Sequence, residues 1–253
     1  LFQLCDRRHL RGEGLGGKGV SLITKEELYS HLKATTKCYE SVESFPHEPK
    51  LPNSYYCWNA PKDWKEDGHY LDTLLGNFDN LETPLDSVLL RAMFCAPAWG
   101  GRAGFRPAWA ITAPEPQCGK STIADVVGIL YGNQIELEPS QLADPRLISR
   151  LLTPDALSKR VVRVDNIKSF MGSDLLESLV TSQHISGHRL YSGEASRPNY
   201  LTFILTANGI MLTPDFAERC FFIRLSKPTY RPEWKESVMA YACKYRDYIL
   251  EDI

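Results

Sequence analysis

The sequence lacks the features that define several common protein classes. Its 253 residues contain no apolar run near the roughly 20 residues needed to cross a membrane, and no signal-peptide pattern opens the chain. The 29 Lys and Arg residues and the 31 Asp and Glu residues nearly cancel, leaving a formal charge of −2. This balance excludes nucleic-acid binding through a global excess of basic charge, but it is compatible with a basic patch in a groove.

A disulfide framework and a zinc ribbon are also missing. The seven cysteines are odd in number, irregularly spaced and without a Cys-x-x-Cys pair, which argues against both. Reduced thiols indicate a cytoplasmic protein, in a bacterial or host cell. Because the first residue is Leu rather than Met, we expect a piece of a longer protein.

The composition, 43% hydrophobic and 24% charged, is that of an ordinary globular protein. Residue patterns divide the chain into four regions: an irregular or β N-terminal region with a connector (1–66), a helical region (67–99), an α/β core (100–228) and one C-terminal helix (229–253). Strands and helices alternate in the core. The expected strands are Trp109–Thr112, Gln134–Leu137, Val161–Val164, Leu201–Thr206 and Phe221–Leu225. The expected helices are Lys120–Tyr131, Asp144–Leu152, Ser173–Ser182 and, at the end of the chain, Pro232–Leu250.

The strongest chemical signal is a Gly-Lys-Ser triplet between the first expected strand of the core and the helix after it. Backbone amides at a helix N-terminus can wrap an anion there, and Lys120 can reach the terminal phosphates of a nucleotide. The first glycine of G-x-x-x-x-G-K-[ST] is missing, since Pro114 holds its position. The alternative is a simple helix cap. The predicted ATP-binding residues are Glu115, Pro116, Gln117, Cys118, Gly119, Lys120, Ser121 and Thr122.

Three weaker signals follow along the chain. An apolar strand ends in Asp165 and Asn166, where a carboxylate can hold the water shell of Mg²⁺. Another strand leads into Asn208, and Arg219 comes just before the last strand. Taken singly, each signal has a structural alternative. Asp165 fits a turn after a buried strand, Asn208 fits an Asn-Gly turn, and Arg219 fits a surface position.

In this order, the four signals resemble Walker A, Walker B, sensor 1 and the arginine finger of AAA+ P-loop ATPases. The resemblance covers roughly residues 100–228. Within that family the chain looks most like the superfamily-three-like ring helicases of small viruses and the primase-helicases of phages and mobile elements. The resemblance implies a three-layer α/β P-loop NTPase core with a largely parallel central sheet.

The resemblance also implies roles for single residues. Lys120 would bind the β- and γ-phosphates of ATP, and Ser121 and Asp165 would bind Mg²⁺. Asn208 would position the attacking water, and Arg219 would reach the ATP of the neighbouring subunit. Asn166 stands where the family usually has the acidic residue that activates water, and an amide cannot accept that proton. The implied partners are further copies of the chain in a ring of six, single-stranded DNA, and a primase module in the same longer chain.

Residues 184–199 lie where such helicases carry a DNA-gripping β-hairpin. This window is locally basic, because its only acidic residue is Glu194 and its basic residues are His184, His188, Arg189 and Arg197. The predicted DNA-binding residues are His188, Arg189 and Arg197. The alternative is a solvated hairpin with incidental charge.

Two other patterns favour structural roles. The G-x-G-x-x-G match at 14–19 has no helix directly after it, so we expect a hairpin turn rather than a dinucleotide site. The aromatic residues Tyr55, Tyr56, Trp58 and Trp64 are expected to pack against the core rather than to stack on bases. Three functions remain open: a ring-forming DNA helicase, an AAA+ loader or remodeller acting on protein, and an ATP-binding module with little hydrolysis.

Overall fold

The computed structural model describes residues 11–13, 20–22, 25–35, 39, 41–144, 146–167, 170–189, 193–229 and 231–253. The chain divides into two units, Leu1–Glu40 and Ser41–Ile253. In the first unit, the antiparallel strands β1 (Arg11–Glu13) and β2 (Val20–Leu22) precede helix α1 (Lys25–Thr35). The glycine-rich turn predicted over 14–19 lies outside the described residues.

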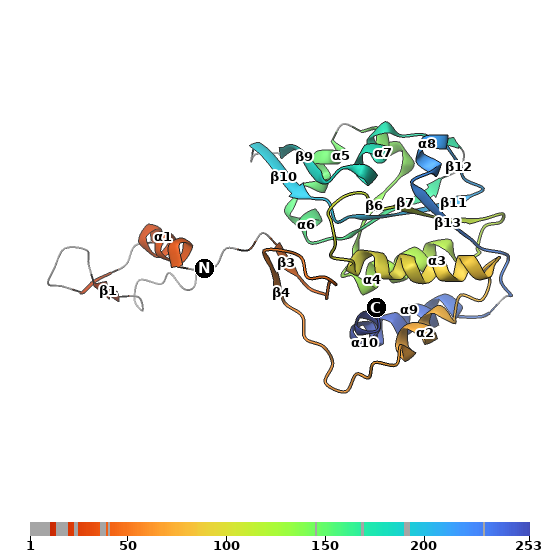
Figure 1. Cartoon of the computed structure of the whole chain (residues 1–253), viewed down its shortest axis with the longest axis horizontal. Helices are drawn as coiled ribbons and strands as arrows, with labels where there is room; N and C mark the ends of the chain where they lie inside the picture. The colour runs from red at the N-terminus through yellow and green to blue at the C-terminus, as the bar shows by residue number, and fades with distance from the viewer. Residues whose placement is uncertain are drawn as a thin grey trace. The chain divides into compact units, whose positions relative to one another are not determined.

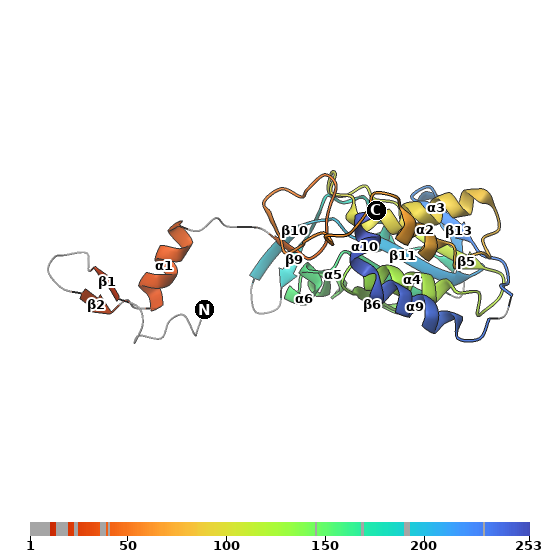
Figure 2. The same cartoon turned by 90° about the horizontal axis from the view of Figure 1, so that it is seen from below.

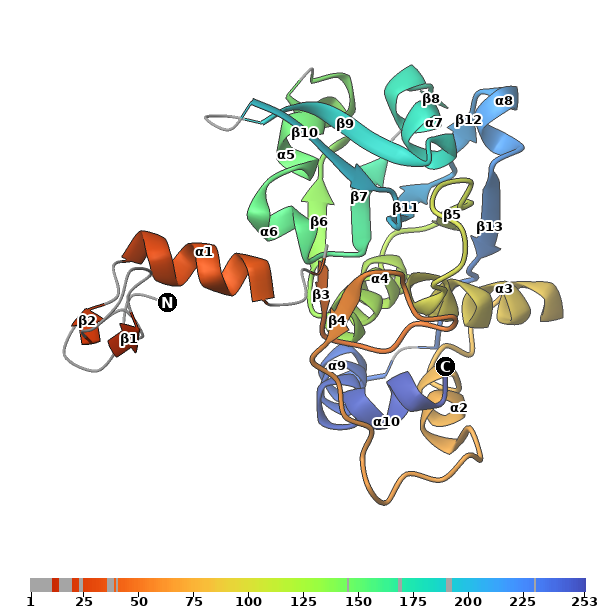
Figure 3. The same ribbon diagram turned by 60° about the vertical axis from the view of Figure 1, so that its left-hand side comes forward.

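The second unit is built on a five-stranded sheet in the order β13–β5–β11–β7–β6, and all its strand pairs are parallel (Figure 3). The strands are β5 (Ala108–Ala113), β6 (Gln134–Leu137), β7 (Val161–Ile167), β11 (Thr202–Asn208) and β13 (Cys220–Arg224). The central strands are buried over most of their length, as in a parallel sheet covered on both faces. All five predicted strands are therefore confirmed, with small shifts of their ends.

Helices cover both faces of this sheet (Figure 1). One layer contains α2 (His69–Leu75), α3 (Pro84–Cys95), α4 (Lys120–Leu130), α9 (Trp234–Lys244) and α10 (Arg246–Glu251), which face the viewer in Figure 2. The other contains α5 (Leu147–Leu151), α6 (Pro154–Leu157), α7 (Asp174–Thr181) and α8 (Pro214–Ala217).

Side chains of β5 alternate between the two layers. Trp109 and Ile111 belong to the core under the first layer, and Ala108 and Ala110 to the core under the second. This alternation follows from the two-residue period of a strand. The predicted three-layer α/β fold is thus confirmed.

Short elements complete the second unit. Two small parallel pairs join β3 (Ser41–Glu43) to β4 (Ser54–Tyr56) and β8 (Phe170–Met171) to β12 (Met211–Leu212). An antiparallel hairpin joins β9 (His184–Arg189) to β10 (Gly193–Pro198). The 3₁₀ turns η1 (Ala96–Ala98) and η2 (Pro139–Ala143) follow α3 and β6.

The connector after β4 lies against the end of the chain. The indole nitrogen of Trp58 donates to Glu251 at 2.6 Å, and that of Trp64 donates to Asp252 at 2.7 Å. Trp58 also packs against the core, as predicted, whereas Tyr55 is 50% exposed, contrary to the packing role expected of it.

Two helix predictions need correction. The C-terminal segment forms two helices rather than one, because Tyr245, at ψ 19°, interrupts it. The break lets Ile249 and Leu250 enter the core below the sheet. The helix predicted from Asp144 begins only at Leu147, because the Asp144 carbonyl accepts from the Leu147 amide and ends the preceding turn.

Candidate functional site

The loop between β5 and α4 presents backbone amides at the carboxyl edge of the sheet. Two residues in the left-handed region shape it, Gln117 at φ 61° and Gly119 at φ 88°. A side chain at position 119 would also meet the ring of Trp234, which lies 3.0 Å from the place of an added Cβ. No described side chain caps the amino end of α4, so its first amides are left for an anion.

The predicted ATP-binding residues differ in exposure. Glu115, Pro116 and Gln117 are exposed on the loop. Cys118 and Thr122 are buried, at 2% and 6% exposure. The first three are therefore open to a ligand, whereas the last two support the loop from inside.

Lys120 is the buried cation of the site. Only 9% of the residue is exposed, and its Nζ donates to the backbone carbonyl of Glu115 at 3.0 Å. Burial lowers the pKa of Lys120, while nearby Cys118 and Asp165 oppose that shift. An ammonium group has further N–H donors, so Lys120 can keep this bond and still hold a phosphate oxygen.

Asp165 lies in a β-bulge that turns its carboxylate towards α4. Val164 pairs with Leu205 and Ile167 with Ala207, so Asp165 and Asn166 together oppose the single residue between those partners. The Ser121 hydroxyl lies 3.4 Å from Asp165 Oδ1. Hydroxyl and carboxylate oxygens are ligands that Mg²⁺ prefers, so this pair fits the predicted magnesium role.

The two predicted asparagines are exposed near this pair. Asn166 has a φ of 61°, a conformation that Asn tolerates better than most residues. Asn208 ends β11 directly opposite Ala113, the last residue before the phosphate-binding loop. Both amides therefore lie at the same edge of the sheet as Lys120, Ser121 and Asp165.

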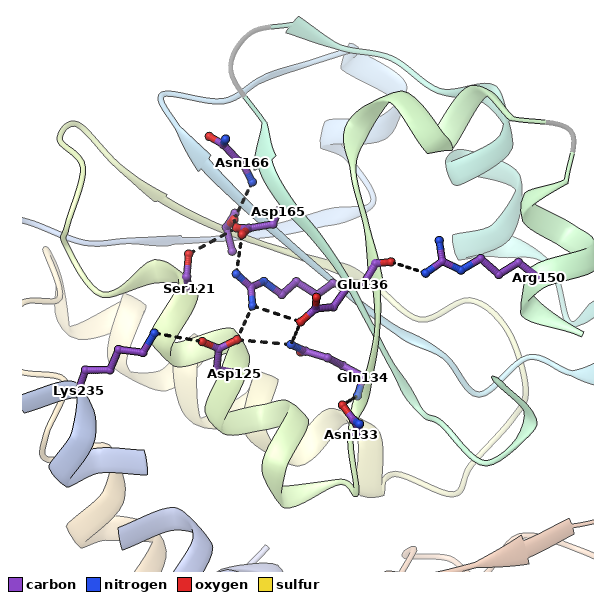
Figure 4. A network of polar contacts seen from close by, with 11 residues as sticks. Ser121, Asp125, Asn133, Gln134, Glu136, Arg150, Asp165, Asn166 and Lys235 are labelled. Atoms are coloured by element: carbon purple, nitrogen blue, oxygen red, sulfur yellow. Dashed lines mark hydrogen bonds and ion pairs between the residues drawn. The ribbon is translucent and has the colours of Figure 1, made fainter. Parts of the chain in front are cut away.

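Sequence analysis missed the residues that hold Asp165. The Thr206 hydroxyl donates to Asp165 Oδ1 and accepts from the Asn166 amide at 3.1 Å. Arg163 donates to Asp165 Oδ2 at 2.6 Å and also bonds Asp125 on α4 (Figure 4). The available signal was a charged residue, Arg163, inside an otherwise apolar strand. Thr206 gave no comparable signal.

A further residue that the sequence did not indicate, Asn80, holds the backbone of the loop between β5 and α4. Asn80, between α2 and α3, donates to the carbonyl of Cys118 at 3.0 Å and to that of Ser226 at 2.8 Å. Beside it lies a cavity of about 110 Å³ whose wall includes Gln117, Asn77 and Trp234. The loop thus borders a small cavity through Gln117 and Cys118.

Arg219 lies at the amino ends of the parallel strands, whereas the other predicted catalytic residues lie at their carboxyl ends. Its carbonyl accepts from the amide of Ala108, the first residue of β5, whereas the phosphate-binding loop follows the last residue of that strand. A strand of this length spans about 17 Å. The exposed guanidinium donates to the Asp215 carbonyl at 2.5 Å and lies 4.0 Å from Glu177. Arg219 is therefore not brought together with the other predicted catalytic residues of its own chain.

The hairpin predicted between Asp165 and Asn208 is present as β9 and β10. Ile185 is buried, whereas His184, Ser186 and His188 are exposed on alternate positions of β9. The carbonyl of His188 accepts from the Ser149 hydroxyl on α5 at 2.7 Å. One face of the hairpin is therefore fixed to α5 and the other is open. Arg189 ends β9, and its side chain lies outside the described residues.

The prediction that Arg197 contacts DNA is wrong for the side chain as it lies here. Arg197 is only 5% exposed, and its guanidinium donates to backbone carbonyls that include those of Ala156 and Leu151, at 2.7 and 3.3 Å. Burial lowers the pKa of Arg197 to about 10. The residue holds the α5–α6 region against β10, so it does not add to the basic surface of the hairpin.

Comparison with known proteins adds evidence on the fold. No protein-family model matches the sequence, and no curated protein matches it. The A-form apo structure of the NrS-1 C-terminal region is similar, with a TM-score of 0.55 and 15% identity over 92% of this chain. A second structure of that region gives 0.53 and 14% over 92%. A JCV helicase structure gives 0.46 and 13% over 72% of this chain and 51% of that one.

The chain spans about three fifths of the NrS-1 C-terminal region, 61% in both structures. At this identity the likeness concerns the fold. Together with the parallel sheet and its loop–helix junction, it confirms at the level of the fold the P-loop NTPase architecture that the motifs predicted. In the described part of the chain, no helix is both long and apolar enough to cross a membrane.

Proposed function

We propose that this chain is a Mg²⁺-dependent, ATP-hydrolysing P-loop ATPase that assembles into a ring and moves along DNA. The observation that carries the proposal is the meeting of Lys120, Ser121 and Asp165 at the carboxyl edge of a parallel sheet. A buried ammonium, free helix amides and an oxygen pair for a metal are the groups that phosphoryl transfer requires.

The chain's own residues have distinct tasks in this proposal. The amides at the start of α4 and the Lys120 ammonium hold the phosphates, and Ser121 and Asp165 hold the magnesium ion, which neutralises phosphate charge when bound. Asn208 orients the attacking water from the neighbouring strand end. The cavity beside Gln117 and Trp234 adjoins the loop and is the place where the base of the nucleotide would enter.

The position of Arg219 supports the proposal that copies of the chain assemble into a ring. Because Arg219 is separated from its own phosphate-binding loop by the length of β5, it would complete the site of a neighbouring copy. The proposed ring has six copies, and the proposed partners include a primase module.

DNA contact is proposed at the open face of the β9–β10 hairpin. His188 is exposed there, and Arg189 follows it on the strand. With Arg197 excluded, the surface carries less basic charge than the sequence suggested, so we expect weak, salt-sensitive binding of single-stranded DNA.

A second candidate is an ATP-binding module with little hydrolysis. It is favoured by Asn166, which is exposed beside Asp165 and has no carboxylate to accept a proton. An AAA+ loader or remodeller acting on protein is a third, and it predicts hydrolysis without an effect of DNA.

A multiple-turnover ATPase assay with and without single-stranded DNA, at low and high salt, separates these functions. The proposed helicase-type activity requires Mg²⁺-dependent turnover that DNA stimulates, with stimulation lost at high salt. Turnover that DNA leaves unchanged favours the remodeller, and binding without turnover favours the ATP-binding module. A chain that neither binds nor hydrolyses ATP contradicts the proposal altogether.

A further inference from the structure

Arg163 is a buried cation behind the proposed metal site. It lies on β7 two residues before Asp165, and it is only 7% exposed. Its side chain extends from the strand towards α4, because its guanidinium bonds Asp125 on that helix. A guanidinium in this position is costly to bury unless carboxylates balance its charge.

Carboxylates from three elements surround that guanidinium. One terminal nitrogen bonds Asp125 on α4 and lies 3.9 Å from Glu136 on β6, while the other donates to Asp165 Oδ2 at 2.6 Å. Asp125 also lies 3.7 Å from Lys235 on α9. The planar fork therefore ties Asp165 to α4, the helix that begins with the phosphate-binding residues.

The two oxygens of Asp165 have different surroundings. Oδ2 is taken by Arg163, whereas Oδ1 faces the hydroxyls of Thr206 and Ser121. The carboxylate cannot rotate without losing these bonds. Its side chain is still 44% exposed, so the oriented group remains open to a ligand.

We propose that Arg163 is a positioning residue for the metal-binding carboxylate of Asp165. By occupying Oδ2, it directs Oδ1 and the remaining free edge of the carboxylate towards Ser121. The inference rests on the proposed function, since it concerns the same metal site. Residues that orient a metal ligand typically change metal affinity by about 10–100-fold when they are replaced.

The test measures metal affinity apart from turnover. Binding of Mn²⁺, a stand-in for Mg²⁺ with the same preference for oxygen ligands, is followed by electron paramagnetic resonance of the free ion, in the presence of a non-hydrolysable ATP analogue. Affinity for the analogue without metal is measured in EDTA. The variants are Arg163→Gln, Arg163→Lys and the matched control Arg150→Gln, whose arginine donates to the Glu136 carbonyl at 2.9 Å but does not contact Asp165 in the described structure.

We expect Arg163→Gln to weaken Mn²⁺ binding by about tenfold or more and to leave metal-free nucleotide affinity unchanged. Arg163→Lys should recover part of the loss, since it restores the positive charge but not the two terminal nitrogens of the guanidinium. Arg150→Gln should bind Mn²⁺ with the affinity of the parent. Mn²⁺ binding by Arg163→Gln that equals or exceeds the parent's overturns the inference. A loss of metal-free affinity in equal measure, without recovery by Lys, also overturns it.

Failure of the proposed function and misfolding of a variant can each be told apart from failure of the positioning role. If the parent chain itself binds no metal–nucleotide complex, the proposed function fails, and the inference fails with it. If Arg163→Gln does not fold, Asp125→Ala provides the second test, because it removes the acceptor that anchors Arg163 on α4 while leaving Arg163 in place. Asp125→Ala should weaken Mn²⁺ binding, and a folded variant with parental Mn²⁺ affinity contradicts the positioning role.

Discussion

Two lysines near the loop between β5 and α4 differ in their burial. Lys120 is buried, and burial lowers its pKa. Lys227 is exposed, and its hydrogen bond to Glu115, 2.8 Å away, raises its pKa. Both ammonium groups lie near the same loop residue, but only Lys120 contacts the loop backbone. The pair therefore provides a matched comparison.

Lys120→Ala is expected to abolish measurable ATP binding, because the loop loses the charge that faces the phosphates. Lys227→Ala should bind ATP like the parent. Fluorescence titration with a labelled nucleotide measures both, and thermal unfolding checks that each variant is folded. Equal affinities for the Lys120 variant and the parent would contradict the assignment of the loop.

Asn166 sets the expected rate of hydrolysis. Asn166→Asp supplies a carboxylate beside Asp165, with a short side chain that also tolerates the left-handed conformation. Because a positioned general base contributes typically 10²–10⁴-fold, we expect the variant to raise turnover by about tenfold or more, measured as phosphate release at saturating ATP. Unchanged turnover in a folded variant would show that another group serves as base or that a different step is limiting.

At the scale of elements, the connector between β3 and β4 inserts a histidine into the core. His47 is 3% exposed and lies between the rings of Phe45 and Tyr56. Neither ring nitrogen has a hydrogen-bond partner among the described residues. Burial, with smaller contributions from Arg160 and Arg106, lowers the pKa of His47 to about 3.

This shift predicts a pH dependence of stability. Since the folded-state pKa lies below the unfolded value of 6.5, the neutral form stabilises the fold above pH 6.5, and that stabilisation is lost as the pH falls towards 3. The contribution of one such proton is about 1.4 kcal/mol per pH unit. His47→Leu should remove it, so that urea unfolding from pH 6.5 to 4.5 shows a shallower fall than the parent's.

The exposed His69 gives the control. His69→Leu should keep the parental slope of unfolding free energy against pH. If His47→Leu also keeps that slope, the histidine is not neutral in the folded chain, and the burial argument is wrong.

At the scale of the whole molecule, the separation of Arg219 from Lys120 predicts sites shared between copies. Arg219→Ala should lose turnover, by about 10³-fold or more where an arginine finger acts, and keep its ATP affinity. Mixing it with Lys120→Ala should partly restore activity, because some junctions then pair the Arg219 of one variant with the intact loop of the other. Turnover is measured across mixing ratios and protein concentrations.

The matching control is a mixture of Arg219→Ala with Lys227→Ala, which should only dilute parental-type activity in proportion to composition. Absence of rescue in the first mixture, together with turnover independent of protein concentration, would return Arg219 to the role of a surface residue before β13.

Local patterns in the sequence were sufficient to predict the strands of the central sheet and the loop–helix junction after β5. Apolar runs of strand length, each followed by a helical period, predict a parallel α/β sheet, and a Gly-Lys-Ser triplet between strand and helix predicts a phosphate loop. Because the carboxyl ends of parallel strands meet at one edge, the sequence also brings Asp165 and Asn208 near Lys120. These predictions depend on residues that act through their own position in the chain.

Contacts between distant segments were decided only by the tertiary structure. Arg163 and Arg197 are both arginines in or next to β-type segments, yet one bonds the carboxylate of Asp165 and the other is taken up by backbone carbonyls. The bulge at Asp165 and Asn166, opposite Thr206, and the insertion of His47 likewise depend on neighbouring strands and rings. Sequence spacing fixes which face of an element a residue occupies, but burial and pairing partners arise from packing between elements. Packing is therefore what gave Arg163 a carboxylate partner and Arg197 backbone partners.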